Sequence, residues 1–398
     1  MVMKNTNTQK STIHFPRRIN DGKNNVFRFG FPLHLLSGGE GNIRKMIIFL
    51  GEDFRNLPNT DLSRAIAISN QCLNYIRREC NGCELYYKPH PTETDEFAML
   101  NLEGFKVMEK APVELAFMKH ADRIQHVFST CSTASRIAYE FGFNSSVFLD
   151  PIAPALNPET VNGFRVFLAM LPKECFIENF SQALLENKKR LGTREELEDQ
   201  VRTLVVGRRG TAWMLIGDPN ALPYAKVVDM LVKKSNPEIS LHLVISLHRR
   251  WETMPIDEVK KFFEKVSFIP REFYSVQPKK LLNAWRTARL IHAWPIDKND
   301  VIISRLGLAF TDDCFASYFP NNPRVALMPG DFFDTTCGEQ KLNQEQYRSR
   351  LGAKFFNLIL EPILGIERTE YLEDKKRIAN VYRYARPLND IFDAVWVY

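Results

Sequence analysis

The stretch IQHVFSTCSTASRIAYEFGF, residues 124–143, indicates the fold more clearly than any other part of the chain. Its first part, IQHVFST, is predicted to be a buried strand, and ASRIAYEFG is predicted to be a helix that ends at Gly142. Four hydroxyl-bearing residues, Ser129, Thr130, Ser132 and Thr133, lie at the junction of the two elements. A strand that ends just before a helix in this way is typical of a parallel sheet, whose ligands bind beyond the carboxyl ends of the strands.

The same alternation of strand and helix occupies the preceding part of the chain. RKMIIFLGEDFRNLP predicts a buried strand that ends at Gly51, and Asp61 then opens an amphipathic helix as its N-cap. CELYYKPHP predicts the next strand, which Pro89 and Pro91 prevent from continuing. Short apolar strands that alternate with helices indicate an α/β domain with a parallel sheet covered on both faces.

A second alternating pattern follows a charged, helical stretch. Strands are predicted in TAWMLIGDPN, ISLHLVISLHRRW, DVIIS and RVALMPGDFFD. With 398 residues, the chain is longer than one hydrophobic core usually serves. We therefore predict two Rossmann-like domains: residues 1–204, which include the helical bridge, and residues 205–398, which include C-terminal helices.

The composition is that of an ordinary soluble globular protein, with 44% hydrophobic and 25% charged residues and a net charge of +6. The basic runs lack interleaved aromatic residues, so we expect no nucleic-acid partner. The seven cysteines give no disulfide framework, and Cys80 and Cys83 are expected to be a reduced pair rather than a metal site. The start of the chain has no signal-peptide core, and no apolar stretch is long enough to span a bilayer, which predicts a cytoplasmic protein.

Polar and charged residues follow the predicted strands of the first domain. Because the carboxyl ends of parallel strands share one edge of a sheet, we expect these residues to surround one phosphate group. The chain has neither G-x-G-x-x-G nor a P-loop motif, which argues against a dinucleotide or a P-loop nucleotide. A rigid K-P-H-P turn and ordinary N-cap hydroxyls are the structural alternatives. The candidate nucleotide-binding residues are Gly51, Arg55, Lys88, His90, Pro91, Glu114, Ser129, Thr130, Ser132 and Thr133.

KPHP, then PVE at the start of a helix, then a Ser/Thr-rich strand end resembles the CMP-binding half of bacterial sialyltransferases and of the related Kdo transferases. The resemblance spans about residues 45–150. It implies that His90 and Pro91, together with Ser132 and Thr133 or with Ser129 and Thr130, hold the phosphate of a CMP-activated sugar. It also implies that Glu114 contacts the ribose or the base.

The order of the two domains favours one of these families, the Kdo transferases. The nucleotide half comes first, as in the bacterial retaining β-Kdo transferases, which implies a GT-B-type architecture with swapped domain order. The resemblance implies transfer of Kdo from CMP-Kdo, through an aspartyl–sugar adduct, to a lipid-linked glycan acceptor of a lipopolysaccharide O-antigen or capsule. Neither a cofactor nor a metal is expected. The implied setting is the inner face of the inner membrane, with peripheral membrane association and with the chain as one module of a larger protein.

Carboxylates that follow strands of the second domain are the candidate nucleophiles. Asp218 in IGDPN is the first choice, although an Asx-turn before a proline would explain it equally. Asp331 resembles by position the catalytic acid of sialyltransferases, whose full motif is not reproduced here. His248 is a candidate for acid–base chemistry, and Glu159 could face the cleft from a proline-rich loop. The rival functions are an inverting CMP-sialic acid sialyltransferase and a non-catalytic nucleotide-binding module.

Overall fold

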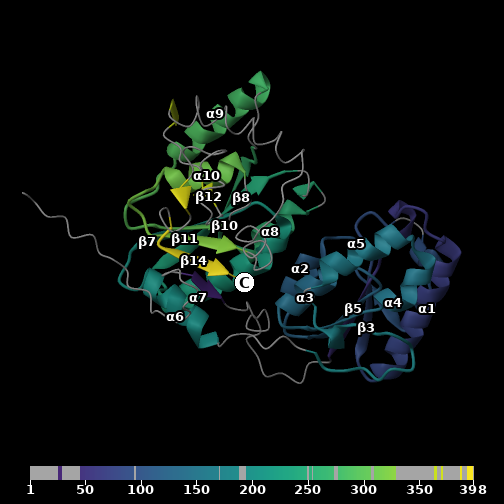
Figure 1. Ribbon diagram of the computed structural model, residues 1–398. Helices are drawn as coiled ribbons and strands as arrows, with labels where there is room; N and C mark the ends of the chain where they lie inside the picture. Colours follow the sequence, from purple (N-terminus) through teal and green to yellow (C-terminus); the bar gives the residue numbers. More distant parts are fainter. Residues whose placement is uncertain are drawn as a thin grey trace, which may run out of the picture.

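The computed structural model of the protein shows two α/β domains that lie side by side (Figure 1). It describes residues 26–28, 45–93, 96–169, 171–187, 194–248, 251–252, 254–272, 277–305, 309–328, 363–364, 369–370, 386–387 and 392–397.

The first domain is built on a parallel sheet of five strands within the described residues, in the order β4-β3-β2-β5-β6. All five residues of β2 are buried, because helices cover both faces of the sheet. Since β2 comes first in the chain, the strand order changes direction between β2 and β5, and this switch point is where α/β sheets bind ligands. The strands are β2 (Met46–Leu50), β3 (Glu84–Lys88), β4 (Phe105–Val107), β5 (Ile124–Ser129) and β6 (Asn144–Val147).

The second domain repeats this plan in a larger parallel sheet, which has seven strands in the described part of the chain. The order is β1-β14-β11-β10-β7-β8-β9, so its switch point lies between β7 and β10. The strands are β1 (Val26–Arg28), β7 (Gly210–Ile216), β8 (Ile239–Leu247), β9 (Lys265–Pro270), β10 (Val301–Arg305), β11 (Arg324–Met328) and β14 (Ala394–Val397). A separate parallel pair joins β12 (Thr369–Glu370) to β13 (Arg386–Pro387).

The helices follow the alternation that the sequence predicts. Asp61 caps the first helix as expected, because its carboxylate accepts a hydrogen bond from the Arg64 backbone N–H at 3.0 Å. Gly142, with a φ of +85°, ends the third helix as predicted. The helices are α1 (Leu62–Glu79), α2 (Val113–Lys119), α3 (Ala134–Glu140), α4 (Leu149–Ile152), α5 (Pro158–Leu168), α6 (Arg194–Val205), α7 (Leu222–Ser235), α8 (Ile256–Phe262), α9 (Pro278–His292) and α10 (Phe310–Ser317).

The predicted α/β fold with two Rossmann-like domains is confirmed by these strand orders. Two elements differ from the prediction or were missed. β1 lies in the second sheet beside β14, so this sheet takes strands from both ends of the chain. A strand of three residues is too short to show a period in the sequence. The segment SSVFLD (residues 145–150), whose apolar run after Gly142 predicts a single strand, is instead divided between β6 and α4.

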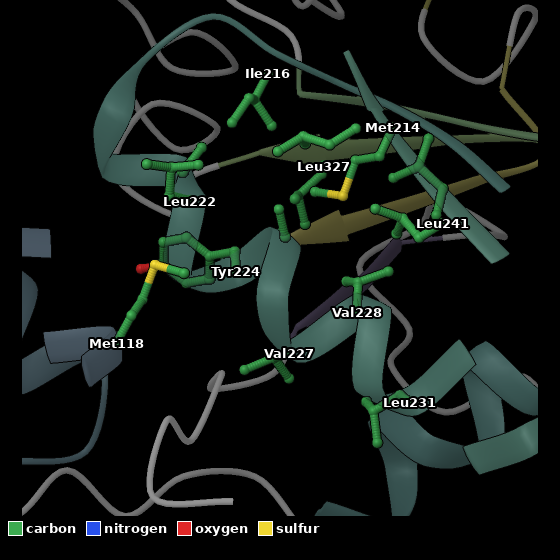
Figure 2. Close-up of a cluster of buried hydrophobic side chains, with 14 of the residues drawn as sticks. Met118, Met214, Ile216, Leu222, Tyr224, Val227, Val228, Leu231, Leu241 and Leu327 are labelled. Atoms are coloured by element: carbon green, nitrogen blue, oxygen red, sulfur yellow. The ribbon is translucent and has the colours of Figure 1, made fainter. Parts of the chain in front are cut away.

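Apolar side chains join the two domains. Met118 of α2 points toward Tyr224 of α7, and both belong to one cluster of buried hydrophobic residues (Figure 2). The Tyr224 ring also packs on Phe141, with 4.7 Å between ring centroids. An ion pair of 3.0 Å between Lys119 and Glu258 lies at the same junction. This contact sets the carboxyl ends of the two sheets against each other.

Candidate functional site

A cleft of about 370 Å³ lies at the carboxyl ends of strands from both sheets. Its volume is in the range of pockets that bind small molecules. The first domain lines it with residues that follow β2, β3 and β5 and with the start of α2, and the second domain with the turn after β7. Eight of the predicted residues meet there: Gly51, Lys88, Pro91, His90, Glu114, Ser132, Thr133 and Asp218.

His90 is oriented by a chain of polar side chains that begins in the neighbouring strand connection. The Thr92 hydroxyl donates a hydrogen bond to the buried carboxylate of Asp53, and Thr92 Oγ1 lies 2.8 Å from His90 Nδ1. Because Thr92 gives its only proton to Asp53, this contact is best made with Nδ1 as the donor. The Thr92 backbone N–H lies farther from Nδ1, at 3.3 Å, and would suit the other tautomer. We therefore infer that Nδ1 carries the proton in the neutral ring.

The pKa of His90 is lowered by burial, which disfavours the imidazolium, and by Lys88. Asp53 acts in the opposite direction. The ring is therefore neutral near pH 7 in the free protein, and a bound anion would favour its protonated form.

The K-P-H-P turn itself is fixed by Glu93, a residue that the sequence analysis did not single out. One carboxylate oxygen of Glu93 accepts from the His90 backbone N–H at 2.9 Å, and the other accepts from the Tyr87 hydroxyl at 2.6 Å. This pair lies against Gly51, where an added Cβ would come within 2.6 Å of Glu93 Oε2. Gly51 thus allows the turn to approach the end of β2.

Lys88, which is buried, and Glu114, which is partly exposed, both line the cleft and carry formal charges of opposite sign. Burial lowers the pKa of Lys88 to about 8, against the opposing effect of Glu114, Glu93 and Glu109. Burial likewise raises the pKa of Glu114, which Lys88 partly counteracts. Near pH 7, Lys88 is therefore still largely protonated and can supply one positive charge to a ligand.

The four hydroxyl residues after β5 divide into two pairs. Ser129 and Thr130 are fully buried, and Ser129 Oγ accepts hydrogen bonds from Ser132 N–H at 3.2 Å and from Ser135 Oγ at 2.7 Å. Ser132 and Thr133 line the cleft. Ser129 therefore stabilises the turn, whereas Ser132 and Thr133 are accessible to a ligand in the cleft.

Glu52 is a partly buried carboxyl group beside the same turn. Burial raises its pKa to about 7, and the Cys131 thiol donates a hydrogen bond to its Oε2 at 3.7 Å. Glu52 follows Gly51 directly at the end of the predicted strand. Its burial could not be predicted, because nothing in the sequence distinguishes it from an exposed acid.

Asp218, from the turn after β7, has both carboxylate oxygens engaged by side chains of the neighbouring strands. Arg305 Nη1, at the end of β10, lies 2.9 Å from Oδ2, and His248 Nε2, after β8, lies 3.2 Å from Oδ1. The Asp218 side chain keeps about 20% of its surface exposed, on the cleft. A carboxylate held in one orientation and reachable from the cleft can act as a nucleophile or base.

A second arginine, Arg271, packs against the turn after β7. The Arg271 guanidinium packs against Gly217, where any side chain would overlap it, and lies 3.4 Å from Asp312 in α10. The Trp251 indole N–H donates to the Gly217 carbonyl at 2.8 Å. Asp312 thus has a structural contact with Arg271.

Of the predicted site residues that the structure describes, five are not among those that line the cleft: Arg55, Ser129, Thr130, Glu159 and His248. Arg55 is exposed in the 3-10 turn η2 (Phe54–Asn56). Glu159 is also exposed, and its expected loop is in fact the first turn of α5, because Asn157 caps that helix and Pro158 starts it. Asp331 lies outside the described residues.

A larger cavity of about 430 Å³ lies at the opposite, amino-terminal edge of the first sheet, lined by residues that include Cys80, Cys83 and His126. The thiols of Cys80 and Cys83 are both free. Across the residues that the structure describes, no group of three or more His, Cys, Asp or Glu side chains is placed to hold a metal ion. Within the same residues, no helix is both long and apolar enough to cross a membrane.

No protein-family model and no curated protein matches the chain. Among solved structures, it is similar to E. coli heptosyltransferase WaaC with ADP, at 8% sequence identity and a TM-score of 0.19, over 71% of this chain and 86% of that chain. It is also similar to a UDP-N-acetylglucosamine 2-epimerase, at 14% identity and a TM-score of 0.20, over 81% of this chain and 90% of that chain. At these scores, the function has to be inferred from the cleft residues.

Proposed function

We propose that the protein is a glycosyltransferase that moves Kdo from CMP-Kdo to a hydroxyl of a bacterial surface-polysaccharide acceptor, with retention of configuration. The main support is the meeting of His90, Ser132 and Thr133 from one domain with Asp218 from the other in a single cleft. In this proposal the first domain binds CMP, so the nucleotide half precedes the catalytic half. The CMP-sugar is a substrate, and no cofactor takes part.

The phosphate of CMP-Kdo is placed between His90, Lys88 and the hydroxyls of Ser132 and Thr133. Lys88 contributes a positive charge, and the His90 ring, once protonated, donates through Nε2 while Nδ1–H donates to Thr92. Asp53 stabilises the imidazolium through that hydroxyl. Preorganised donors of this kind stabilise the negative charge that develops on the departing CMP.

Asp218 then attacks the anomeric carbon of Kdo. The bond between that carbon and the phosphate oxygen breaks, its electron pair leaves with CMP, and an ester bond forms between the sugar and one Asp218 oxygen. Arg305 and His248 hold the carboxylate in orientation before this step. They are therefore assigned as positioning residues for the nucleophile.

The acceptor hydroxyl completes the reaction by attacking the same carbon. The ester bond to Asp218 breaks and the carboxylate is restored, while the hydroxyl proton passes to a base, for which we assign His248, whose Nε2 lies 3.2 Å from Asp218 Oδ1. Two inversions give net retention. We place the acceptor on a lipid-linked glycan at the inner face of the inner membrane, where the chain would work as one module of a larger protein.

Thermal unfolding with a panel of nucleotides tests the donor class. We expect CMP to stabilise the protein and UDP, GDP and NAD to leave its melting temperature unchanged. At a hundred times its dissociation constant, a ligand adds about 2.7 kcal/mol of stability, which is readily measured. Stabilisation by UDP or GDP in place of CMP would overturn the proposal.

Transfer assays with CMP-Kdo and CMP-sialic acid then distinguish the rival functions, with the product configuration read by NMR. Retained configuration with CMP-Kdo is the expected result. Inverted product from CMP-sialic acid would identify a sialyltransferase, and binding of CMP without turnover of either donor would identify a non-catalytic module.

A further inference from the structure

Helix α9 packs on the second domain through one narrow face. Its buried residues are spaced at i, i+3, i+4 and i+7, and they pack into the core between α9, α10 and the sheet. They are Ala284, Thr287, Ala288 and Ile291. Most side chains on this buried face are small. In Figure 1 the helix lies at the periphery of its domain, far from the first domain.

The outward face of α9 carries large apolar side chains. Leu282 is 46% exposed, Trp285 37% and Leu290 47%. The Arg289 guanidinium lies over the Trp285 ring, 5.0 Å from its centroid. Exposed apolar side chains grouped on one element usually mark an interaction surface, because isolated ones are what a soluble surface ordinarily shows.

The charge on this helix has one sign only. Within residues 278–292 the sequence contains no Asp or Glu, and its four formally charged side chains are Lys279, Lys280, Arg286 and Arg289, all in exposed positions. Two of the lysines stand in the first turn, where the helix dipole disfavours cations. This placement gives the helix itself no stability, so the charges point to an anionic partner.

Helix α5 provides an internal contrast. It also exposes large apolar side chains, with Val166 at 75% and Phe167 at 59%. Its neighbouring cation, Arg165, is instead paired with Asp150 at 3.3 Å. Exposed apolar residues therefore coincide with a cluster of basic side chains on α9, of which Lys280 lies close enough to Glu272 to affect the pKa of that carboxyl, but not on α5.

We propose that α9 docks the protein on the surface of an anionic lipid bilayer. Leu282, Trp285 and Leu290 would enter the interface between headgroups and acyl chains, while lysine and arginine side chains reach the acidic headgroups. Each basic residue near such a surface strengthens binding by about fivefold. This inference does not depend on the CMP-sugar proposal.

Docking by α9 also orients the second domain. The helix follows β9, so its first turn with Lys279 and Lys280 lies toward the carboxyl edge of the second sheet, the edge that carries Asp218. A bilayer along α9 would therefore run beside the second sheet, on the side of the second domain that faces away from the first domain (Figure 1).

Sedimentation with lipid vesicles tests this surface in the full chain. We expect binding to vesicles of phosphatidylcholine mixed with phosphatidylglycerol and weak or no binding to phosphatidylcholine alone, with a loss at high salt. The double variant Arg286→Glu, Arg289→Glu should bind anionic vesicles at least about tenfold more weakly. The matched control is Val166→Ser, Phe167→Ser on α5, which should bind like the wild type.

A second measurement keeps the test valid if a variant unfolds. Vesicles with brominated acyl chains should quench tryptophan fluorescence, and Trp285→Phe should remove most of this quenching while α9 stays bound. Unchanged binding of the Arg286→Glu, Arg289→Glu variant would overturn the proposal. So would a loss of binding in the α5 control, or binding to double-stranded DNA but not to vesicles.

Discussion

His90 and Asp218 face the same cleft, but the two domains hold them by different means. In the first domain, a hydroxyl and two buried carboxylates, those of Asp53 and Glu93, orient a neutral imidazole and its backbone. In the second domain, Arg305 and His248 each contact one oxygen of a partly exposed carboxylate, that of Asp218. We call the His90 side of the cleft the first wall and the Asp218 side the second wall. The imidazole of the first wall can gain a proton when an anion binds, whereas the second wall holds a carboxylate in a fixed orientation.

This difference matches the division of labour in the proposed reaction. A leaving phosphate needs donors and positive charge, which protonation of His90 supplies at the moment of binding. A nucleophile needs to stay ionised and oriented throughout the cycle, which a paired arginine favours. The contrast also implies that changes on the two walls should have separable effects on binding and on turnover.

The largest expected effect is on the second wall. Asp218→Asn removes the nucleophile and should lower the turnover of CMP-Kdo by at least about a thousandfold, while the dissociation constant of CMP changes by less than about twofold. Steady-state kinetics and calorimetry measure the two quantities. Glu159→Gln, an exposed change outside the cleft lining, should leave both unchanged. Weakened CMP binding with normal turnover would reverse the assignment of the two walls.

The next effect concerns the pKa of Glu52, which lies in the first domain beside the turn after β5. The pKa of Glu52 is raised to about 7 from an ordinary 4.5, so the folded protein favours the protonated carboxyl. Its stabilising contribution is complete below about pH 4.5 and is lost as the pH rises through 7. Glu52→Gln, which stays neutral, should therefore raise the free energy of unfolding at pH 8 by up to about 3 kcal/mol.

Chemical denaturation at pH 5 and pH 8 checks this prediction. The advantage of Glu52→Gln should shrink markedly at pH 5, where the wild-type carboxyl is protonated in the folded state. A stability difference that does not depend on pH would show that the Glu52 carboxyl is solvated like an ordinary surface acid.

Much of this comparison could be predicted from the sequence. The strand ends gave Lys88, His90, Ser132 and Asp218, because period and turn residues locate each strand and the carboxyl ends of parallel strands share an edge. The link between Asp218, His248 and Arg305 could not be predicted. It requires the spatial order β8-β7-β10, and a strand-by-strand pattern does not determine which strands become neighbours.

The contacts between the loop after β2 and the loop after β3 could not be predicted for a similar reason. Thr92 and Asp53 are 39 residues apart, and each alone is an ordinary polar residue of a turn. Glu93 lies two residues after the stretch CELYYKPHP that contains His90, but its role depends on the hydrogen bond that it accepts from the Tyr87 hydroxyl of β3. Side-chain direction and burial, which only the packed structure provides, turn these residues into one network.

Calorimetry of CMP binding at pH 7, in buffers of different ionisation enthalpy, is the most direct test of the central claim that His90 meets the phosphate. Because burial lowers the pKa of His90 and phosphate would raise it, binding should take up protons and affinity should fall as the pH rises. His90→Ala should weaken CMP binding at least about tenfold, abolish that proton uptake and slow transfer by roughly ten- to a thousandfold. His120→Ala is the matched control, since burial also lowers the pKa of His120 but the residue does not line the cleft. Equal affinity and equal proton uptake in wild type and His90→Ala would contradict the account.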